Sequence, residues 1–389
     1  MRDRVQSVRA FSLTQHRQTP YLGALRSGEE PNAKGYFLRR GNGTVYPIFD
    51  RSVLVRIETA SGVAGWGETY GLVAPGAVGA IIDDLLADFT VGRNPADPAT
   101  VYDDLYDLMR VRGYTGGFYV DALAAIDIAL WDIAARLEGV SVTELLGGVV
   151  RDRIPAYVSG LPETTINARA ELAKSWQSRG FNAFKFAAPV ADDGLTAEIA
   201  ALRAALGPDA RIAADMHWKY GAHDAIEEIR AMAAHGLWFA EAPVRPEDVT
   251  GLEIVCRNAG VPIAVGEEWR THHDLRNRID RCGISIVQPE MGHTGLTGFM
   301  RIAQLAGRHG LDVIPHATVG SGVFLAASLH ASAALEPVTG HEFQHSVFES
   351  SRGLLDGDLA CTEGFYTAPG GPGLGVEPSE RALSRLKPI

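Results

Sequence analysis

The sequence predicts an α/β protein in which a closed parallel (β/α) barrel follows a smaller α+β unit. From about residue 154 onward, short β-rich runs alternate with helical segments, which indicates right-handed crossovers and a parallel sheet. The runs recur at nearly equal spacing, with polar residues at or just past their ends at 215, 241, 267, 290 and 316. So many equal units favour a closed barrel over an open, doubly wound sheet.

Residues before the barrel predict the α+β unit. Residues 51–58 alternate in hydrophobicity like a half-buried strand, and a Ser-Gly turn leads into a second strand at 63–68. The two strands are therefore expected to form an antiparallel hairpin. Residues 79–137 have a mainly helical pattern that ends at a predicted C-cap, Gly139.

A long polar stretch, Thr14–Asp50, precedes this hairpin. It is rich in Gly, Pro and Arg, and it is too long for an idle connection in a compact domain. Two interpretations stay open: a lid or binding loop over a site, or a disordered segment.

The predicted barrel strands are short apolar runs with helical segments between them. They are AFKF (183–186), RIAAD (211–215), LWFAE (237–241), IAVGE (263–267), ISIVQ (284–288) and DVIPH (312–316). No GxGxxG frame joins a strand to a helix, and no GxxxxGK[ST] motif is present, so the sequence does not predict a nucleotide site.

Composition excludes several classes of function. Lys and Arg number 36 against 47 Asp and Glu, a net charge of −11 that disfavours nucleic acid or an anionic membrane as partner. The three cysteines lack CxxC spacing, which argues against a disulfide framework or a zinc knuckle and fits a reducing cytoplasm. The amino-terminal residues lack an apolar signal region, and Asp121, Asp127 and Asp132 interrupt the most hydrophobic stretch, 120–137. We therefore expect a soluble, cytoplasmic protein.

Three acidic residues end successive predicted strands: Asp215, Glu241 and Glu267. The carboxyl ends of barrel strands converge on one face, so these buried carboxylates would repel one another unless a cation neutralised them. Oxygen donors with open positions suit Mg²⁺, and the absence of Cys or His from the trio disfavours zinc. The alternative is that each acid caps a helix or pairs with an arginine.

Other polar residues lie at the same predicted barrel mouth. His316 ends a later strand and Glu290 follows the strand before it, so the carboxylate could fix the tautomer of a catalytic imidazole. Lys185 interrupts an apolar run and either faces the mouth, where it would stabilise an oxyanion, or reaches solvent at the strand edge.

Two further basic residues follow the first acid. Strand alternation would place His217 and Lys219 on the same side as Asp215 if the strand continued that far. His217 is then either an acid/base group or a substrate contact. The cluster His272-His273-Asp274 is predicted to open the next helix rather than to bind a metal.

This order of acids and a histidine on successive strands resembles the enolase superfamily, and within it the mandelate racemase subgroup. The likeness covers nearly the whole chain. Its landmarks are GVAGWGE (62–68), AIDIALWDIAARLEG (125–139), ELLGG (144–148), the FKF strand, WFAEAPVRPED (238–248), AVGEE (264–268), IVQPE (286–290), VIPH (313–316) and PGGPGLGVE (369–377).

The resemblance implies a modified (β/α)7β TIM-type barrel at 138–350 under an α+β capping domain at 1–137, which is completed by the carboxyl-terminal segment 351–389. It implies Mg²⁺ at the three strand-end acids and removal of the proton α to a carboxylate, with the metal and Lys185 stabilising the enediolate. It also places Glu342 against the substrate carboxylate. The family further suggests an even-numbered homo-oligomer.

Departures from the subgroup pattern favour one reaction. The frequent Lys-x-Lys pair is Lys185-Phe186-Ala187 here, so the obvious second base for a racemase is missing. The acid beside the histidine is Glu290 rather than the usual Asp. His217 stands where many relatives have Asn, which is similar to sugar-acid dehydratases. A dehydratase needs fewer groups: His316 takes the α-proton, and His316 or His217 protonates the departing β-hydroxyl.

We therefore expect a small-molecule substrate, an aldonate or aldarate. Cations in the amino-terminal loop, which lids the site in this family, favour a diacid such as galactarate, unless that loop is simply solvated. These cations are Arg17, Arg26, Lys34, Arg39 and Arg40. Rival hypotheses are racemisation, epimerisation or lactone cycloisomerisation, with His217 or Lys219 as second base, and a non-catalytic protein that binds sugar acids.

Overall fold

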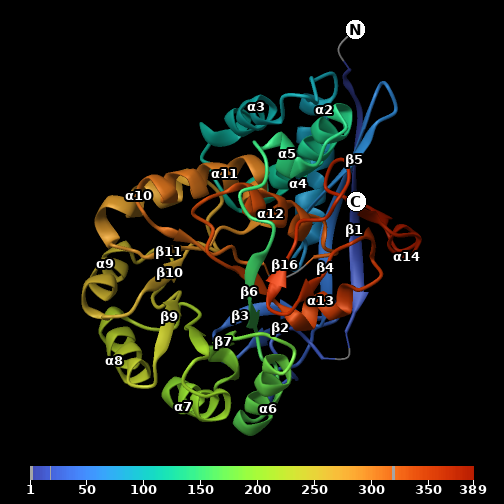
Figure 1. Ribbon diagram of the computed structural model, residues 1–389. Coiled ribbons are helices and arrows are strands. Elements are labelled where there is room, and N and C mark those ends of the chain that lie inside the picture. Colours follow the sequence, from blue (N-terminus) through green and yellow to red (C-terminus); the bar gives the residue numbers. More distant parts are fainter. Residues whose placement is uncertain (1–2, 18, 318–319) are drawn as a thin grey trace.

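The computed structural model describes residues 3–17, 19–317 and 320–389 (Figure 1). Its amino-terminal part is an antiparallel sheet in the order β18-β1-β4-β5, covered on one face by helices. The elements are β1 (Val5–His16), β4 (Phe49–Thr59), β5 (Ala64–Tyr70), α1 (Pro75–Ile81), a π-helical turn (Ile82–Leu86), α2 (Ala87–Thr90), α3 (Pro98–Arg110), α4 (Gly117–Glu138), α5 (Val142–Leu145) and β18 (Lys387–Pro388). The predicted hairpin is confirmed as β4–β5, and Gly139 caps α4 at φ 71°.

Helix α4 packs directly on strand β5. A Cβ atom on Gly67 would lie 1.8 Å from the carbonyl oxygen of Ala125, so glycine is required for this close approach. One residue of α4, Asp132, accepts hydrogen bonds from the backbone N–H groups of Trp66 (3.0 Å) and Leu374 (2.9 Å). The buried carboxylate thereby joins the helix to the sheet and to the carboxyl-terminal segment.

The second part of the chain forms the barrel. Its elements are β6 (Ile154–Ser159), α6 (Ile166–Gln177), β7 (Ala183–Ala187), a 3-10 turn (Ala188–Val190), α7 (Leu195–Leu206), β8 (Arg211–Asp215), α8 (Ala222–Ala233), β9 (Leu237–Glu241), α9 (Val249–Asn258), β10 (Ile263–Val265), α10 (His272–Cys282), β11 (Ile286–Val287), α11 (Met291–Arg308), β12 (Asp312–Val313), α12 (Val323–Ala334) and β13 (His341–Phe343). Strands β6 to β12 lie side by side in chain order, and β13 pairs with β6.

Hydrogen bonds next to β13 close the ring. Glu342 donates its backbone N–H to the Pro315 carbonyl (3.1 Å), and Thr339 donates to Val313 (3.0 Å). Within the described residues the barrel therefore has eight parallel strands joined by seven helices, which confirms the predicted (β/α)7β class. Each of the six predicted runs contains a strand. The six runs do not include β6 or β13. Strand β13 has three residues, and two of them, His341 and Glu342, are buried but polar, so no apolar run marks it.

The carboxyl-terminal segment returns to the first sheet. Its elements are α13 (His345–Ser351), β14 (Leu355–Gly357), β15 (Cys361–Thr362), β16 (Phe365–Tyr366), β17 (Val376–Pro378), α14 (Glu380–Leu383) and β18. Strand β16 pairs with β6 of the barrel, and β18 pairs with β1. The expected completion of the capping domain by this segment is confirmed.

The long polar stretch near the amino terminus is folded where it is described, so the disordered alternative is wrong there; residue 18 lies outside the described residues. Strands β2 (Tyr36–Arg39) and β3 (Thr44–Pro47) form an antiparallel hairpin. The fully buried Arg39 pairs with Glu29 (2.9 Å) and donates to the backbone carbonyls of Tyr21 and Gly23 (both 3.1 Å). This arginine holds the stretch in a compact form. In the described part of the chain, no helix is long and apolar enough to cross a membrane.

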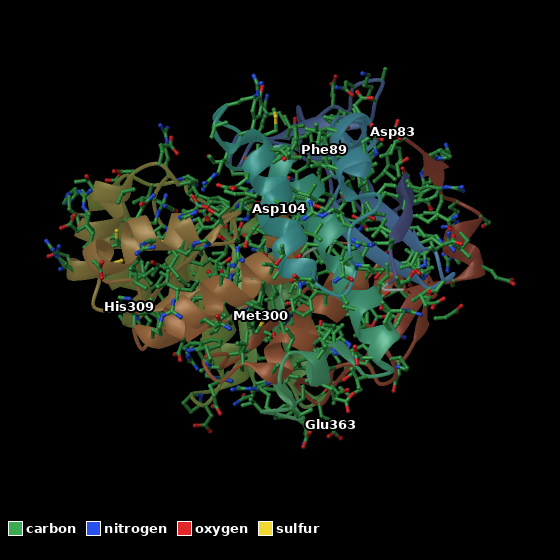
Figure 2. The ribbon with its side chains drawn as sticks, turned by 90° about the horizontal axis from the view of Figure 1, so that it is seen from above. Asp83, Phe89, Asp104, Met300, His309 and Glu363 are labelled. Atoms are coloured by element: carbon green, nitrogen blue, oxygen red, sulfur yellow. The ribbon has the colours of Figure 1, made fainter. Side chains whose placement is uncertain are left out.

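Helix α11 of the barrel lies against α3 and α4 of the capping domain, as the view from above shows near Asp104 and Met300 (Figure 2). In this interface, Asp127 of α4 accepts hydrogen bonds from the backbone N–H and the hydroxyl of Thr297 (both 2.7 Å). Burial raises the pKa of Asp127 to about 7, against the lowering effect of the Thr297 hydrogen bonds. The interface thus holds a carboxyl that titrates near neutral pH.

We expect this carboxyl to make stability depend on pH. Its pKa is higher in the folded state than its ordinary 3.8, so the folded state binds the proton more tightly and stability falls as pH rises from about 4 to 7. The Asp127→Asn variant lacks this proton. Thermal denaturation should show the Tm of the variant rising by a few degrees relative to wild type between pH 5 and 8. A Tm difference that is the same at both pH values would contradict the assignment.

Candidate active site

A cavity of about 200 Å³ lies at the carboxyl ends of the barrel strands. The barrel supplies most of its lining. Tyr21 and Tyr46 enter from the amino-terminal stretch, and Tyr70 enters from the end of β5. The site is therefore shared between the barrel and the capping domain.

The three predicted metal ligands meet in this region. Asp215 and Glu241 end adjacent strands and are direct neighbours in register, and Glu267 follows β10 by two residues. Burial raises the pKa of Glu267 well above its ordinary value, and the neighbouring acids Glu241 and Asp215 raise it further, although His316 opposes them. The mutual repulsion expected from the sequence is thus present in the structure.

Each of these acids contacts one basic side chain: Asp215 contacts His217 (3.0 Å), Glu241 contacts Lys185 (2.6 Å) and Glu267 contacts His316 (3.2 Å). Among the described residues, no three His, Cys, Asp or Glu side chains form a ready metal cluster. The Oε2 atom of Glu267, the oxygen that faces Nε2 of His316, is nevertheless buried without a hydrogen bond. A buried oxygen that makes an ion-pair contact but no hydrogen bond, beside two further carboxylates, fits a hard divalent cation, which prefers oxygen ligands.

Lys185 lies between two acids. Its Nζ is 2.6 Å from Oε1 of Glu241 and 3.2 Å from Oε1 of Glu342. Burial lowers the pKa of Lys185, but the two carboxylates outweigh this and raise the pKa well above its ordinary value. The side chain is buried and charged at the cavity, so the alternative of a lysine reaching solvent at the strand edge is wrong.

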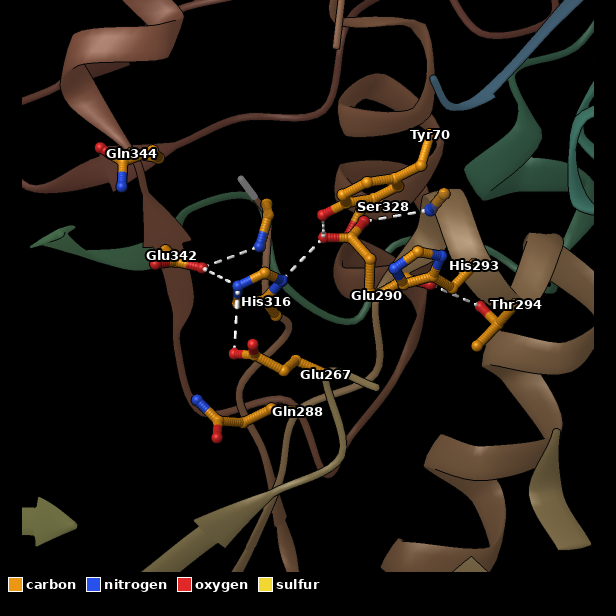
Figure 3. Close-up of polar contacts among 12 residues, drawn as sticks. Tyr70, Glu267, Gln288, Glu290, His293, Thr294, His316, Ser328, Glu342 and Gln344 are labelled. Carbon is orange, nitrogen blue, oxygen red and sulfur yellow. Dashed lines mark hydrogen bonds and ion pairs between the residues drawn. The ribbon is translucent and has the colours of Figure 1, made fainter. Parts of the chain in front are cut away.

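The structure brings His316 and Glu290 together, as Figure 3 shows: Nδ1 of His316 is 2.9 Å from Oε2 of Glu290. The opposite ring atom, Nε2, faces Glu267 (3.2 Å) and Glu342 (3.6 Å). Burial lowers the pKa of His316, but these carboxylates outweigh burial and raise it to about 10. Because Glu290 holds Nδ1, the other ring nitrogen, Nε2, is the one that faces the cavity.

Two residues that the sequence analysis missed support this site. Tyr70 of the capping domain donates its hydroxyl to Oε2 of Glu290 (2.9 Å). Gln288 donates its amide to Oε2 of Glu241 (2.6 Å). Gln288 ends the predicted run ISIVQ, so the strand-end rule could have found it. The position of Tyr70 depends on how the capping domain sits on the barrel, for which the sequence carries no signal.

The chain turns immediately after Asp215. His217 and Trp218 have left-handed backbone conformations, with φ of 51° and 52°. The expected strand continuation is therefore wrong: His217 stays at the cavity, where its Nδ1 is 3.2 Å from the Asn42 amide, but Lys219 is exposed. The ammonium group of Lys219 lies over the Tyr220 ring (5.6 Å) and does not line the cavity.

The structure does not bring Arg17 to the cavity. Its guanidinium is held by Asp50 and Ser346 (both 3.2 Å). Other cations of the same stretch are also engaged elsewhere: Arg26 pairs with Asp192 (2.6 Å) and Arg39 with a glutamate of its own stretch. The predicted loop cations therefore do not line the site.

The cluster His272-His273-Asp274 is structural, as predicted. Thr271 caps helix α10, and the side chain of Asp274 accepts hydrogen bonds from the Thr271 N–H (3.1 Å) and hydroxyl (3.2 Å). The first of these contacts satisfies the Thr271 N–H donor at the helix start.

A capped (β/α)7β barrel with acids on three successive strands defines a class of barrel enzymes whose mouth carries the chemistry. Two family models identify the particular family. "Mandelate racemase / muconate lactonizing enzyme, N-terminal domain" matches residues 48–147, and "Enolase C-terminal domain-like" matches residues 167–382. The chain belongs to the enolase superfamily and to its mandelate racemase group, and the prediction that it is an enzyme is confirmed.

Two curated relatives carry reaction names. D-galactarolactone cycloisomerase from Agrobacterium fabrum is 32% identical over 87% of this chain and 92% of its own length. D-galactonate dehydratase from Ralstonia nicotianae is 32% identical over 87% of this chain and 91% of its own length.

Solved structures share the whole architecture. An enolase superfamily member from Agrobacterium tumefaciens is 66% identical, covers 100% of both chains and superposes with a TM-score of 0.97. A racemase from Streptomyces coelicolor, solved with bound magnesium, is 24% identical over 98% of this chain and 100% of its own, with a TM-score of 0.84. This second likeness shows the fold.

Proposed function

We propose that the chain is a Mg²⁺-dependent hydro-lyase that dehydrates an acid sugar to a 2-keto-3-deoxy acid. The observation that carries this proposal is the meeting of Lys185, His316 and strand-end carboxylates in one cavity. His316 must be neutral to act as the base, which requires that a cation replace it as the partner of Glu267 and so remove the largest contribution that raises its pKa. The neutral imidazole takes the proton from the carbon beside the substrate carboxylate, and the electron pair of that C–H bond forms a C=C bond as the neighbouring C–O bond breaks. The hydroxyl takes a proton from His316 or His217 and leaves as water, and the enol product tautomerises to the keto acid.

The residues that would hold Mg²⁺ are Asp215, Glu241 and Glu267. A bound divalent cation supplies positive charge to the carboxylate oxygens of the substrate and replaces the basic side chains as partner of the three acids. The Oε2 atom of Glu267, which is buried and accepts no hydrogen bond, and the oxygen-only donor set support this assignment. The magnesium-bound structural neighbour is consistent with it.

Three further side chains stabilise charge on the substrate or orient the base. Lys185 places a buried ammonium group where negative charge develops on the substrate carboxylate. Glu342 accepts a hydrogen bond from the Ala317 N–H (2.9 Å). Its other carboxylate oxygen forms an ion pair with the Lys185 ammonium group (3.2 Å). Glu290 orients His316 so that Nε2 is the atom that takes the proton.

Charge at the cavity favours a substrate with one carboxylate. The sequence-based preference for a diacid such as galactarate relied on loop cations, and Arg17 and Arg26 are paired with acids outside the cavity. Among the described residues that line the cavity, two carry a Lys or Arg side chain: Lys185 and Arg270. Arg270 is already paired with Asp121 (3.1 Å), so it is not free to bind a second carboxylate of the substrate. We therefore propose an aldonate as the substrate, which agrees with the name of the galactonate dehydratase relative.

The cycloisomerase relative favours a second candidate, isomerisation of the same class of acid. Incubation of acid sugars with the protein and Mg²⁺ in deuterated water separates the two. A dehydratase forms a 2-keto acid, whereas an epimerase returns labelled substrate without one. Lactone consumption without a keto acid would establish the cycloisomerase instead.

Removal of divalent metal is expected to abolish turnover, and Mg²⁺ should restore it. Because the ion binds the folded state, Mg²⁺ should also raise the Tm of wild-type protein, and Glu267→Gln should reduce that rise by at least half. Differential scanning calorimetry measures both proteins with and without the ion. If Mg²⁺ neither binds nor supports turnover, the sugar-acid-binding alternative gains support.

Other expectations stay predictions: the domain ranges 1–137, 138–350 and 351–389, a cytoplasmic location and a homo-oligomer. Size-exclusion chromatography with light scattering tests the last of these directly.

A further inference from the structure

A third imidazole, beside those of His316 and His217, lines the cavity and has no task in the proposed reaction. His293 lies in the first turn of α11, and its side chain is 13% exposed. Its ring lies next to the Tyr70 ring (Figure 3) and stacks on it, with a centroid separation of 4.0 Å. Tyr70 donates to Glu290, which in turn holds His316. His293 is therefore linked to the catalytic imidazole through two intervening residues and lies further along the cavity wall.

The orientation of His293 is fixed by a buried acid. Its Nδ1 is 2.8 Å from Oδ1 of Asp121, a residue of α4 in the capping domain. Arg270 also donates to Asp121, through Nε (3.1 Å) and through a longer contact from Nη2 (3.4 Å). Burial raises the pKa of Asp121, but His293 and Arg270 outweigh this and lower it, so the group is a carboxylate.

This contact determines which ring nitrogen can bind a ligand. Burial and the charge of Arg270 lower the pKa of His293, so its ring is neutral at pH 7. A carboxylate only accepts hydrogen bonds, so the single ring proton lies on Nδ1 and Nε2 is an acceptor. Within the described residues, no hydrogen bond to this Nε2 is present.

A neutral hydrogen-bond acceptor such as Nε2 of His293 determines which chemical group of a ligand can bind beside it. It repels a carboxylate oxygen, because both present lone pairs, and it attracts a hydroxyl hydrogen. We propose that His293, held by Asp121, recognises one hydroxyl group of the acid sugar on a carbon away from the reacting pair. This inference rests on the proposed function for the identity of the substrate class. It makes His293 a specificity-determining residue contributed by the junction of the two domains.

Deletion of single hydroxyls from the ligand tests the proposal. The ligands are D-galactonate and its 4-, 5- and 6-deoxy derivatives, and calorimetry measures their binding to the Mg²⁺-loaded protein. In wild type, one derivative should bind about 3- to 10-fold more weakly because the hydrogen bond to His293 is lost. In His293→Phe, which keeps a ring against Tyr70, that derivative and D-galactonate should bind equally, and discrimination at the other carbons should persist.

Two further variants control the experiment. His223→Phe makes the same change at an exposed histidine of α8, where the side chain is 84% exposed, and should leave all affinities unchanged. His293→Gln supplies an amide oxygen as acceptor and should restore part of the discrimination. If the Phe protein does not fold, His293→Leu, which also lacks an acceptor, takes its place. A change in KM without a matching change in kcat separates recognition from a disturbed catalytic pair.

The outcomes separate this inference from the proposed function. Unchanged discrimination at every carbon in His293→Phe overturns the role of His293, whether or not dehydration occurs. Binding with the expected discrimination but without keto-acid formation or solvent exchange supports that role and overturns the dehydratase proposal. Failure of wild type to bind D-galactonate overturns both.

Discussion

Turnover of acid sugar by the His316→Asn variant is expected to fall about 10²- to 10⁴-fold, the usual contribution of a general acid–base group. Asparagine keeps a polar contact for Glu290 but has no atom that can take a proton at neutral pH. Keto-acid formation and exchange of the α-proton in deuterated water should decline together, since both begin with removal of the same proton. Far-ultraviolet circular dichroism checks that the fold is retained.

His223→Asn is the matched control for this measurement. His223 is exposed on α8, where its ring lies 3.4 Å from Glu227, so its replacement should leave kcat/KM unchanged. An active His316→Asn protein would overturn the assignment of the base. Exchange retained without product formation would instead move the role of His316 from the first proton transfer to the second.

Replacing Lys185 with Met should cost both stability and activity. The substitution leaves the buried carboxylates of Glu241 and Glu342 without the ammonium group that lies 2.6 Å and 3.2 Å from them. Removal of one partner of a buried ion pair costs about 3–5 kcal/mol, and the lost charge also removes stabilisation of the developing oxyanion. Because the pKa of Lys185 is raised in the folded state, its contribution is fully present at neutral pH.

Urea denaturation at pH 7 measures the stability loss, and Lys174→Met provides the comparison. Lys174 forms an exposed pair with Glu171 (3.0 Å), so its loss should change the free energy of unfolding by less than about 1 kcal/mol. Equal stability of Lys185→Met and wild type would show that the buried acids are neutral in the folded protein. Turnover by the variant at the wild-type rate would remove Lys185 from the mechanism.

The sequence predicted those parts of the site that follow from barrel topology. Asp215, Glu241 and Glu267 could be found because parallel strands bring their carboxyl ends to one face, whatever the details of packing. Lys219 could not be placed correctly. Its position depends on the left-handed turn at His217 and Trp218, and neither residue is a glycine that would have indicated such a turn.

The sequence could not predict the positions of side chains that depend on how the capping domain packs against the barrel. Tyr70 lines the cavity, and Asp121 contacts His293 of the cavity wall, only because β5 and α4 pack against the barrel helices. Arg17 was assigned to the substrate by its charge, and the nearby Asp50, which binds it instead, could not be identified without the packing. Hydrophobic periodicity predicts the elements of each domain, but it carries little information about how two domains are docked.

Pairing of β18 with β1 joins residues 387–388 to residues 11–12. During synthesis, residues 11–12 leave the ribosome long before their partners are made. Amino-terminal regions generally fold first, so the capping sheet must wait with one edge open while the barrel forms. Its final hydrogen bonds form only after residues 387–388 have emerged, so this sheet is completed after all the barrel strands between its two edges have been made.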